Sequence, residues 1–189
     1  MTALFLTHAE VRIDPAVPIP DWGLAPEGRA RHDAFAASGE AAGIGAVFSS
    51  AERKAREAAA PVAERHGVAV RIREPLGEND RSATGYLPRE EFEETADAFF
   101  ARPEESVRGW ERARDAQSRI DATVRAALDE GRPDGDVLFA SHGGVGALLR
   151  CHLLGKPIGR DEVQPHPGGG CLFRFDPAMT GPPTPWRAI

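Results

Sequence analysis

Two histidines each stand directly after a short apolar run, the position at which side chains leave a buried strand. His8 follows the apolar residues 3–6 and one threonine, and His142 follows residues 137–140 and one serine. A neutral imidazole can attack phosphorus, and a protonated imidazole can hold phosphoryl oxygens. The pair therefore indicates phosphoryl chemistry, or binding of a phosphate-like anion, at one end of a sheet.

Positive charge and backbone donors for such an anion are also predicted. Arg53 lies in the first turn of a helix expected over residues 51–65, just after Ser49 and Ser50. A guanidinium group offers planar, bidentate donors that match phosphate. Helix N-termini after Ser50 and Gly144 would add N–H groups and the helix dipole. Phosphoryl transfer depends mostly on such positioning and charge neutralisation.

Three carboxylates in one polar loop are candidates for the proton donor that such a reaction needs. Residues 74–87 are polar and contain glycine and proline, which predicts a long functional loop. Glu78, Glu74 and Asp80 lie in it, and any of them could protonate a leaving alcohol. The choice among the three stays open at this point.

The elements that must position these residues alternate between strands and helices. This alternation predicts an α/β fold of three layers (α/β/α) with a mostly parallel central sheet, whose ligand site lies at the carboxyl ends of the strands. Strands are expected over residues 3–6, 44–48, 68–72, 137–140 and 171–175, and helices over residues 28–42, 51–65, 89–100, 106–130 and 145–154.

Length and composition indicate one ordinary globular domain spanning residues 1–189. The chain is 41% hydrophobic and 28% charged, and its formal net charge is −6. That charge argues against a nucleic-acid or anionic-membrane surface and leaves room for a small phosphate ester. Two cysteines without a CxxC pair, and too few apolar residues before His8 for a signal peptide, predict a cytoplasmic protein.

One segment is expected to differ from the rest of the domain. The tail from about Thr180 contains three prolines and is expected to dock loosely.

Taken together, the motifs resemble those of the histidine phosphatase (phosphoglycerate mutase-like) superfamily, in the same order along residues 4–154. The match to Ser-His-Gly-Gly is close to identical, and Arg53 stands one position earlier than the arginine of many members. The segments that carry the resemblance are LTHAE at 6–10 (Arg-His-Gly-Glu in the family), WGLAPEGRA at 22–30 (Leu-Thr-x-x-Gly-x-x-Gln-Ala), FSSAERKA at 48–55 (Ser-Ser-x-x-x-Arg-Ala), LGE at 76–78 (Leu-x-Glu) and ASHGGV at 140–145.

The resemblance implies a phosphomonoesterase that acts on a small phosphorylated molecule. In that family pattern His8 becomes a phosphohistidine, Arg53 and His142 bind the phosphoryl group, and Glu78 donates the proton. Residues 74–103 would form a cap or specificity insertion beside the site. No metal and no cofactor would be required. The substrate and the oligomeric state are not predicted.

One departure from the family pattern bears directly on the chemistry. Thr7 stands where the family has the arginine before the nucleophile, and a threonine hydroxyl carries no charge. Loss of one preorganised donor costs roughly 10²–10³ in rate in other enzymes. Arg12, Arg56 and Arg81 are candidates to replace it, and Arg81 is preferred because its loop also holds Glu78.

Other functions remain open for the same site. In one, the fold persists without catalysis, and the pocket binds a phosphate or another anion. In the others, the protein is a phosphoglycerate mutase-type phosphotransferase or a phosphatase of phosphohistidine proteins. A metal enzyme built on His8 and His142 is disfavoured, because the sequence lacks ligand spacing.

Overall fold

A six-stranded sheet in the order β3-β2-β4-β1-β5-β6 forms the centre of the molecule. The structure is a computed structural model that describes residues 1–130 and 134–189. Strands β1 to β4 run parallel, whereas β5 is antiparallel to β1, and β6 is antiparallel to β5. The strands are β1 (Ala3–Thr7), β2 (Ile44–Ser49), β3 (Val70–Ile72), β4 (Asp136–Ser141), β5 (Cys171–Phe175) and β6 (Arg187–Ala188).

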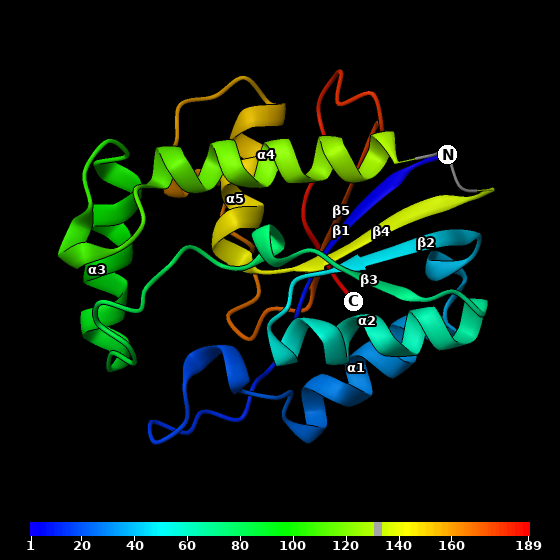
Figure 1. Cartoon of the computed structure of the whole chain (residues 1–189), viewed down its shortest axis with the longest axis horizontal. Coiled ribbons are helices and arrows are strands. Elements are labelled where there is room, and N and C mark those ends of the chain that lie inside the picture. The colour runs from blue at the N-terminus through cyan, green and yellow to red at the C-terminus, as the bar shows by residue number, and fades with distance from the viewer. Residues whose placement is uncertain (131–133) are drawn as a thin grey trace.

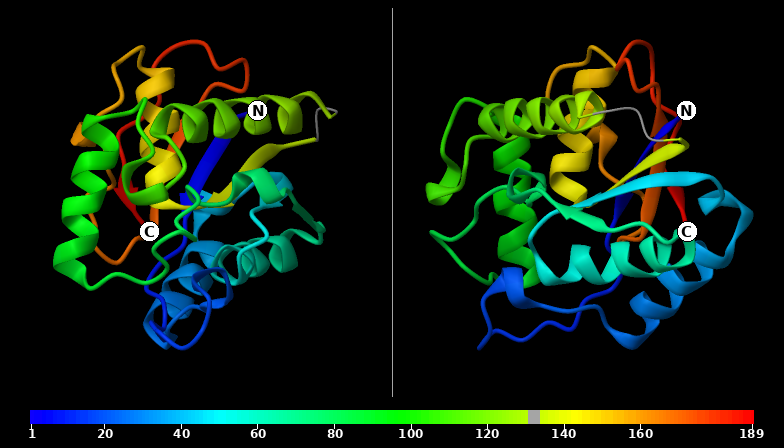
Figure 2. Two further views of the ribbon diagram at one scale, coloured as in Figure 1. Left: turned by 60° about the vertical axis from the view of Figure 1, so that its left-hand side comes forward. Right: turned by 45° about the vertical axis from the view of Figure 1, so that its right-hand side comes forward.

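Helices cover both faces of the sheet, which confirms the predicted three-layer α/β fold. In Figure 1, α4 and α5 lie above the sheet and α1 and α2 below it, while α3 stands to one side. Figure 2 shows the same layers from two other directions. The helices are α1 (Pro26–Ala37), α2 (Arg53–His66), α3 (Arg89–Ala101), α4 (Ala113–Asp129) and α5 (Gly143–Leu153), with short 3-10 turns η1 (Ile19–Asp21), η2 (Gly39–Ala41), η3 (Glu74–Leu76), η4 (Val107–Gly109) and η5 (Arg160–Glu162).

Alternation along the central strands divides the core into two clusters. Phe5 points to the face covered by α4 and α5, whereas Leu4 and Leu6 point to the face covered by α1 and α2. Phe5 stacks on Phe173 of the neighbouring strand, with ring centroids 5.2 Å apart. Because successive side chains of a strand point to opposite faces, a strand buried on both sides has an unbroken apolar sequence.

The register of the parallel strands brings the predicted site residues together. Thr7 pairs with Ser141 across β1 and β4, so His8 and the histidine after Ser141 leave the sheet side by side. The His8 N–H donates to the Ser141 carbonyl at 3.2 Å, and the Ser50 N–H donates to the Ala140 carbonyl at 3.1 Å. Three strand ends therefore meet at one edge of the sheet.

One expected helix begins later than its apolar pattern indicates. The helix predicted over residues 106–130 starts at Ala113, after the short turn η4. Arg108 and Gly109 have φ angles of 53° and 82°, left-handed values that end any right-handed helix. Trp110 follows this break and is nonetheless 2% exposed, so it belongs to the core without being helical.

The C-terminal tail is attached more firmly than the sequence predicts, and the expectation of a loose end from Thr180 is wrong. Residues of β6 pair with β5 at the edge of the sheet, and the Ile189 N–H donates to the Gly170 carbonyl at 3.0 Å. The Trp186 ring packs edge-on against Phe173 at 4.7 Å. Backbone pairing and aromatic packing together outweigh the three prolines of the segment.

Candidate active site

His8 is held with one ring nitrogen free. It directly follows β1, and its Nδ1 lies 2.9 Å from the carbonyl oxygen of Ala9. Because a carbonyl only accepts, Nδ1 carries the hydrogen and Nε2 keeps its lone pair. Burial, together with the nearby His142, lowers the pKa of His8 to about 3. The ring is therefore neutral at ordinary pH, as a nucleophile must be.

His32 of α1 fixes the backbone that orients His8. Its Nε2 accepts the Ala9 N–H at 3.0 Å, and the side chain is fully buried. Burial and the neighbouring Arg31 lower the pKa of His32 to about 4, so the ring stays neutral and can accept. The sequence indicates only a packing role for His32, because a single histidine within a helix carries no spacing signal.

His142 stands at the start of α5 and faces His8. The two ring centroids are 5.2 Å apart, with the planes at 66°. His142 Nε2 lies 2.8 Å from Ser50 Oγ, and its Nδ1 is buried without a partner among residues 1–130 and 134–189. Burial lowers the pKa of His142, although the carboxylates of Glu52 and Glu78 oppose the shift. The strand ends thus bring together the two histidines that the sequence singles out.

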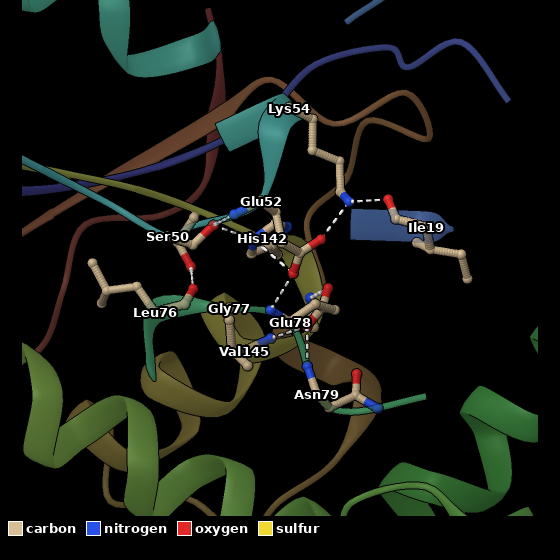
Figure 3. Close-up of polar contacts among 12 residues, drawn as sticks. Ile19, Ser50, Glu52, Lys54, Leu76, Gly77, Glu78, Asn79, His142 and Val145 are labelled. Atoms are coloured by element: carbon tan, nitrogen blue, oxygen red, sulfur yellow. Dashed lines mark hydrogen bonds and ion pairs between the residues drawn. The ribbon is translucent and has the colours of Figure 1, made fainter. Parts of the chain in front are cut away.

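A buried ion pair of Glu52 and Lys54 lies beside His142 (Figure 3). Lys54 Nζ donates to the Glu52 carboxylate and, at 2.9 Å, to the carbonyl oxygen of Ile19. The other carboxylate oxygen of Glu52 accepts the Glu78 N–H at 2.9 Å. Burial by itself would raise the pKa of Glu52, but His142, Lys54 and the Glu78 N–H lower it to about 2.

The cation inside the site is Lys54, and the structure does not bring Arg53 to the histidines. The Arg53 side chain is 57% exposed and pairs with Glu57 at 2.8 Å, whereas Lys54 is 3% exposed. Both residues lie in the first turn of α2, where one step along the chain rotates a side chain by about 100°. Lys54 also has the spacing from Ser49 that the family pattern gives its arginine, a signal that a stricter count would have detected.

Glu78 is the one loop carboxylate that reaches the histidine-bearing helix. Its Oε2 accepts the Gly144 N–H and its Oε1 the Val145 N–H, each at 3.0 Å. A Cβ atom on Gly144 would lie 2.6 Å from Oε1, so this approach requires glycine. Asp80 instead bonds the Ser82 N–H at the surface. Glu78 thus occupies the positive N-terminus of α5, next to His142.

Thr7, which stands at the sequence position of the family arginine, forms an uncharged pair with Gln164. Thr7 is fully buried, and its Oγ1 donates to Gln164 Oε1 at 2.6 Å while accepting the Cys171 N–H at 2.9 Å. This leaves Gln164 Nε2 beside Gly143, where it would lie 2.5 Å from an added Cβ atom. Sequence reasoning misses Gln164, because it follows Thr7 by 157 residues and lies in no recognisable motif.

Arg81 lies near the two carboxylates of the candidate site, Glu52 and Glu78. Its guanidinium group stacks over Phe92 and Trp110, 5.2 Å and 5.6 Å from the ring centroids. It also lines a cavity of about 500 Å³ together with Glu52 and Glu78.

The other two arginines considered as replacements lie elsewhere. Arg12 lines a separate cavity with Arg53, and Arg56 is exposed on α2. Of the three arginines, Arg81 is therefore the one that lines a cavity with the site carboxylates Glu52 and Glu78.

Two structural features bear on metals and membranes. In the part of the chain that the structure describes, no cluster of three or more His, Cys, Asp or Glu side chains could hold a metal ion. Across the same residues, no helix combines the length and apolar character needed to span a membrane.

Solved structures with the same fold cover the whole chain. A mycobacterial glucosyl-3-phosphoglycerate phosphatase complexed with VO3 is 22% identical, with a TM-score of 0.80, and the match covers 100% of this chain and 99% of that one. Its complex with inorganic phosphate is 23% identical, with a TM-score of 0.73 and coverage of 100% and 95%. A Thermus thermophilus protein is 20% identical, with a TM-score of 0.69 and full coverage of both chains. At these identities the likeness is one of fold.

Sequence comparison then identifies the family. No curated protein matches the chain significantly. The sequence profile of the histidine phosphatase superfamily (branch 1), however, matches residues 8–178. That span contains both site histidines, Glu78 and Lys54, and it is most of the chain. The chain belongs to the histidine phosphatase superfamily.

Proposed function

We propose that the protein is a phosphomonoesterase that acts on a small phosphate ester through a phosphohistidine at His8, without a metal. The observation that carries the proposal is the hydrogen bond from His8 Nδ1 to the Ala9 carbonyl. It leaves Nε2 as a neutral nucleophile facing His142. Family membership and the structural likeness to phosphatases support the same class of reaction.

The proposed reaction has two steps. His8 Nε2 forms a bond to phosphorus while the ester P–O bond breaks, and the departing oxygen takes a proton from the Glu78 carboxyl group. Water then attacks the phosphohistidine, Glu78 takes a proton from that water, and the P–N bond breaks. Phosphate leaves, and His8 and Glu78 return to their starting states.

The charge needed for the phosphoryl group comes from a smaller set of donors than the family pattern provides. Lys54 supplies one buried positive charge, and the Gln164 amide supplies a neutral donor beside Gly143. His142 can become doubly protonated when a phosphate dianion approaches its free Nδ1, because Glu52 stabilises the imidazolium from the other side. With one arginine replaced by a neutral pair, we expect slow turnover.

A second candidate function is binding of an anion without catalysis. The observation that favours it is the Thr7–Gln164 hydrogen bond, which pairs uncharged groups at the sequence position of the family arginine. The two carboxylates next to His142, Glu52 and Glu78, also argue against efficient catalysis, because each opposes the approach of a phosphate dianion. In this case the site would hold phosphate and fail to cleave its esters.

One experiment separates the two functions. Hydrolysis of p-nitrophenyl phosphate is measured with EDTA present, across mildly acidic to neutral pH, for the wild type, His8→Ala and His152→Ala. His152 is an exposed histidine at the far end of α5 and serves as the matched control. Turnover that disappears only in His8→Ala, with an acid-labile phosphoryl label on the wild type and on His152→Ala but not on His8→Ala, supports the phosphatase. Phosphate binding by calorimetry without turnover of any ester supports the binding function instead.

A further inference from the structure

A second cavity, of about 450 Å³, opens beside the one that contains Glu52 and Glu78. Its size falls within the range of pockets that hold small organic ligands. Two segments wall it, the loop before α1 and the stretch that leads into α3. Its apolar lining consists mainly of Ile13, Ile19, Trp22, Tyr86, Leu87 and Phe92.

The apolar cavity adjoins the cavity lined by Glu52 and Glu78, because Ile19, Gly85 and Arg81 line both. Glu52 contacts His142 at 3.3 Å, so this neighbouring cavity lies beside the candidate active site. The carbonyl oxygen of Ile19 accepts the bond from Lys54. Ile19 thus contacts the buried cation through its backbone and lines the apolar cavity.

An aromatic pair bridges the two walls of the apolar cavity. Trp22 and Tyr86 have ring centroids 5.9 Å apart, with the planes at 59°. Trp22 is held in place because its Nε1 donates to the carbonyls of Asp14 and Val17, at 2.9 Å and 3.0 Å. Tyr86, by contrast, is 41% exposed at the rim. The Trp22 ring is therefore fixed, whereas the Tyr86 ring is accessible to a ligand in the cavity.

Charge at the cavity excludes cationic ligands and tolerates anionic ones. Arg81 and Arg89 line it, together with Glu93. Glu93 is already paired with Arg160 at 2.9 Å, so its charge is neutralised. An exposed apolar surface of this kind commonly marks a binding site.

We propose that this cavity binds the leaving group of the substrate, and that the substrate is a phosphate monoester of an alcohol carrying an aromatic ring. The inference rests on the proposed function, because it takes the phosphoryl group to lie at Lys54 and His8. The ring of the alcohol packs between Ile19 and the Trp22–Tyr86 pair. Polar sugar or glycerol phosphates lack a group that would fill this space.

The test compares two substrates in three proteins. The ratio of kcat/KM for 2-naphthylmethyl phosphate, an aromatic ester with an alkoxide leaving group, to that for glycerol 2-phosphate is measured in the wild type, in Tyr86→Ser and in Ile72→Ser. Ile72 is a similarly exposed apolar residue, 40% exposed on β3, that lines neither cavity. We expect a ratio well above one in the wild type, lowered about fivefold in Tyr86→Ser and not in Ile72→Ser.

Binding without turnover tests the cavity independently of catalysis. 2-Naphthylmethylphosphonate and methylphosphonate, which cannot be hydrolysed at the P–C bond, are titrated calorimetrically into the same three proteins. Tighter binding of the naphthyl compound that is lost in Tyr86→Ser supports the inference even if no ester is hydrolysed, a result that would overturn only the phosphatase. Equal affinities for the two phosphonates, or an equal effect of Tyr86→Ser and Ile72→Ser, would overturn the inference while leaving hydrolysis intact.

Discussion

The Nε2 atom of His142 lies 3.3 Å from Oε1 of Glu52, in a pocket where a phosphoryl group needs positive charge. The carboxylate is ionised, because its pKa is lowered to about 2. Its charge is balanced by Lys54, which also donates a hydrogen bond to the Ile19 carbonyl. The balance between these two buried charges sets how strongly the site attracts an anion.

Removal of the negative charge at Glu52 should tighten anion binding. Glu52→Gln keeps a side-chain carbonyl that can accept the Glu78 N–H. We expect the Kd for inorganic phosphate to fall about tenfold, as expected for loss of one repulsive charge in a poorly solvated pocket. Calorimetric titration measures it, with the surface variant Glu57→Gln as control. Unchanged affinity in Glu52→Gln would mean that the phosphate binds away from His142.

Removal of the positive charge at Lys54 should have the opposite effect. Lys54→Met keeps the length and apolar stem of the side chain, and we expect the Kd for phosphate to rise at least tenfold. Arg53→Met is the matched control, because Arg53 is the neighbouring cation whose side chain pairs with Glu57 outside the site. A larger loss in Arg53→Met than in Lys54→Met would contradict the arrangement of the first turn of α2.

The role of Glu78 as proton donor predicts a dependence on the leaving group. Glu78→Gln should lower kcat/KM by about a hundredfold for an alkyl phosphate, whose alkoxide needs a proton, and far less for p-nitrophenyl phosphate. Parallel assays of the two substrates check this, with Glu74→Gln as the control carboxylate in the same loop. If Glu78→Gln slows both substrates equally, Glu78 serves to hold the start of α5 and donates no proton.

The buried histidine His32 should make the fold sensitive to acid. Its pKa in the folded state, about 4, lies below the ordinary value of 6.5, so the unfolded chain binds the proton more readily. Its contribution to stability is therefore complete above about pH 6.5 and is lost as the pH falls toward 4, with a slope approaching about 1.4 kcal/mol per pH unit. Urea unfolding across this range should show a shallower pH dependence in His32→Gln than in the exposed control His152→Gln.

The C-terminal tail should contribute measurably to stability. Trp186 packs against Phe173, and its Nε1 donates to the Glu162 carbonyl at 2.7 Å. We expect Trp186→Ala to lower the free energy of unfolding by about 2 kcal/mol, less than for a fully buried tryptophan. Denaturant unfolding measures this, with the exposed Ile72→Ala as control. A change equal to that of the control would mean that the tail docks loosely after all.

The sequence predicts that His8 and His142 lie side by side, for a definite physical reason. An apolar run must be buried, and the first polar residues after it must emerge where the strand ends, so His8 and His142 reach the same edge of a parallel sheet. The same reasoning predicts Ser50. The positions of these residues follow from the strands of the sheet, and the apolar runs that form those strands can be recognised in the sequence.

The remaining contacts depend on features that the pattern does not contain. Arg53 and Lys54 differ by one step around a helix, and only the exact start of α2 decides which one faces inward. Gln164 reaches Thr7 from a loop without periodicity, and His32 acts through the backbone of Ala9. Side chains that arrive from loops, or that act on backbone atoms, leave no spacing from which to predict them.

The pairing of Thr7 with Ser141 also has a consequence for the order of events during synthesis on the ribosome. β1 emerges long before its partner β4, which follows more than 120 residues later in the chain. Until β4 leaves the exit tunnel, the apolar β1 has no neighbour to pair with, and contacts of such long sequence separation form slowly. A nascent chain arrested before Asp136 would expose β1 to chaperones and carry no assembled site, whereas release of α5 would complete both the four parallel strands and the histidine pair in one step.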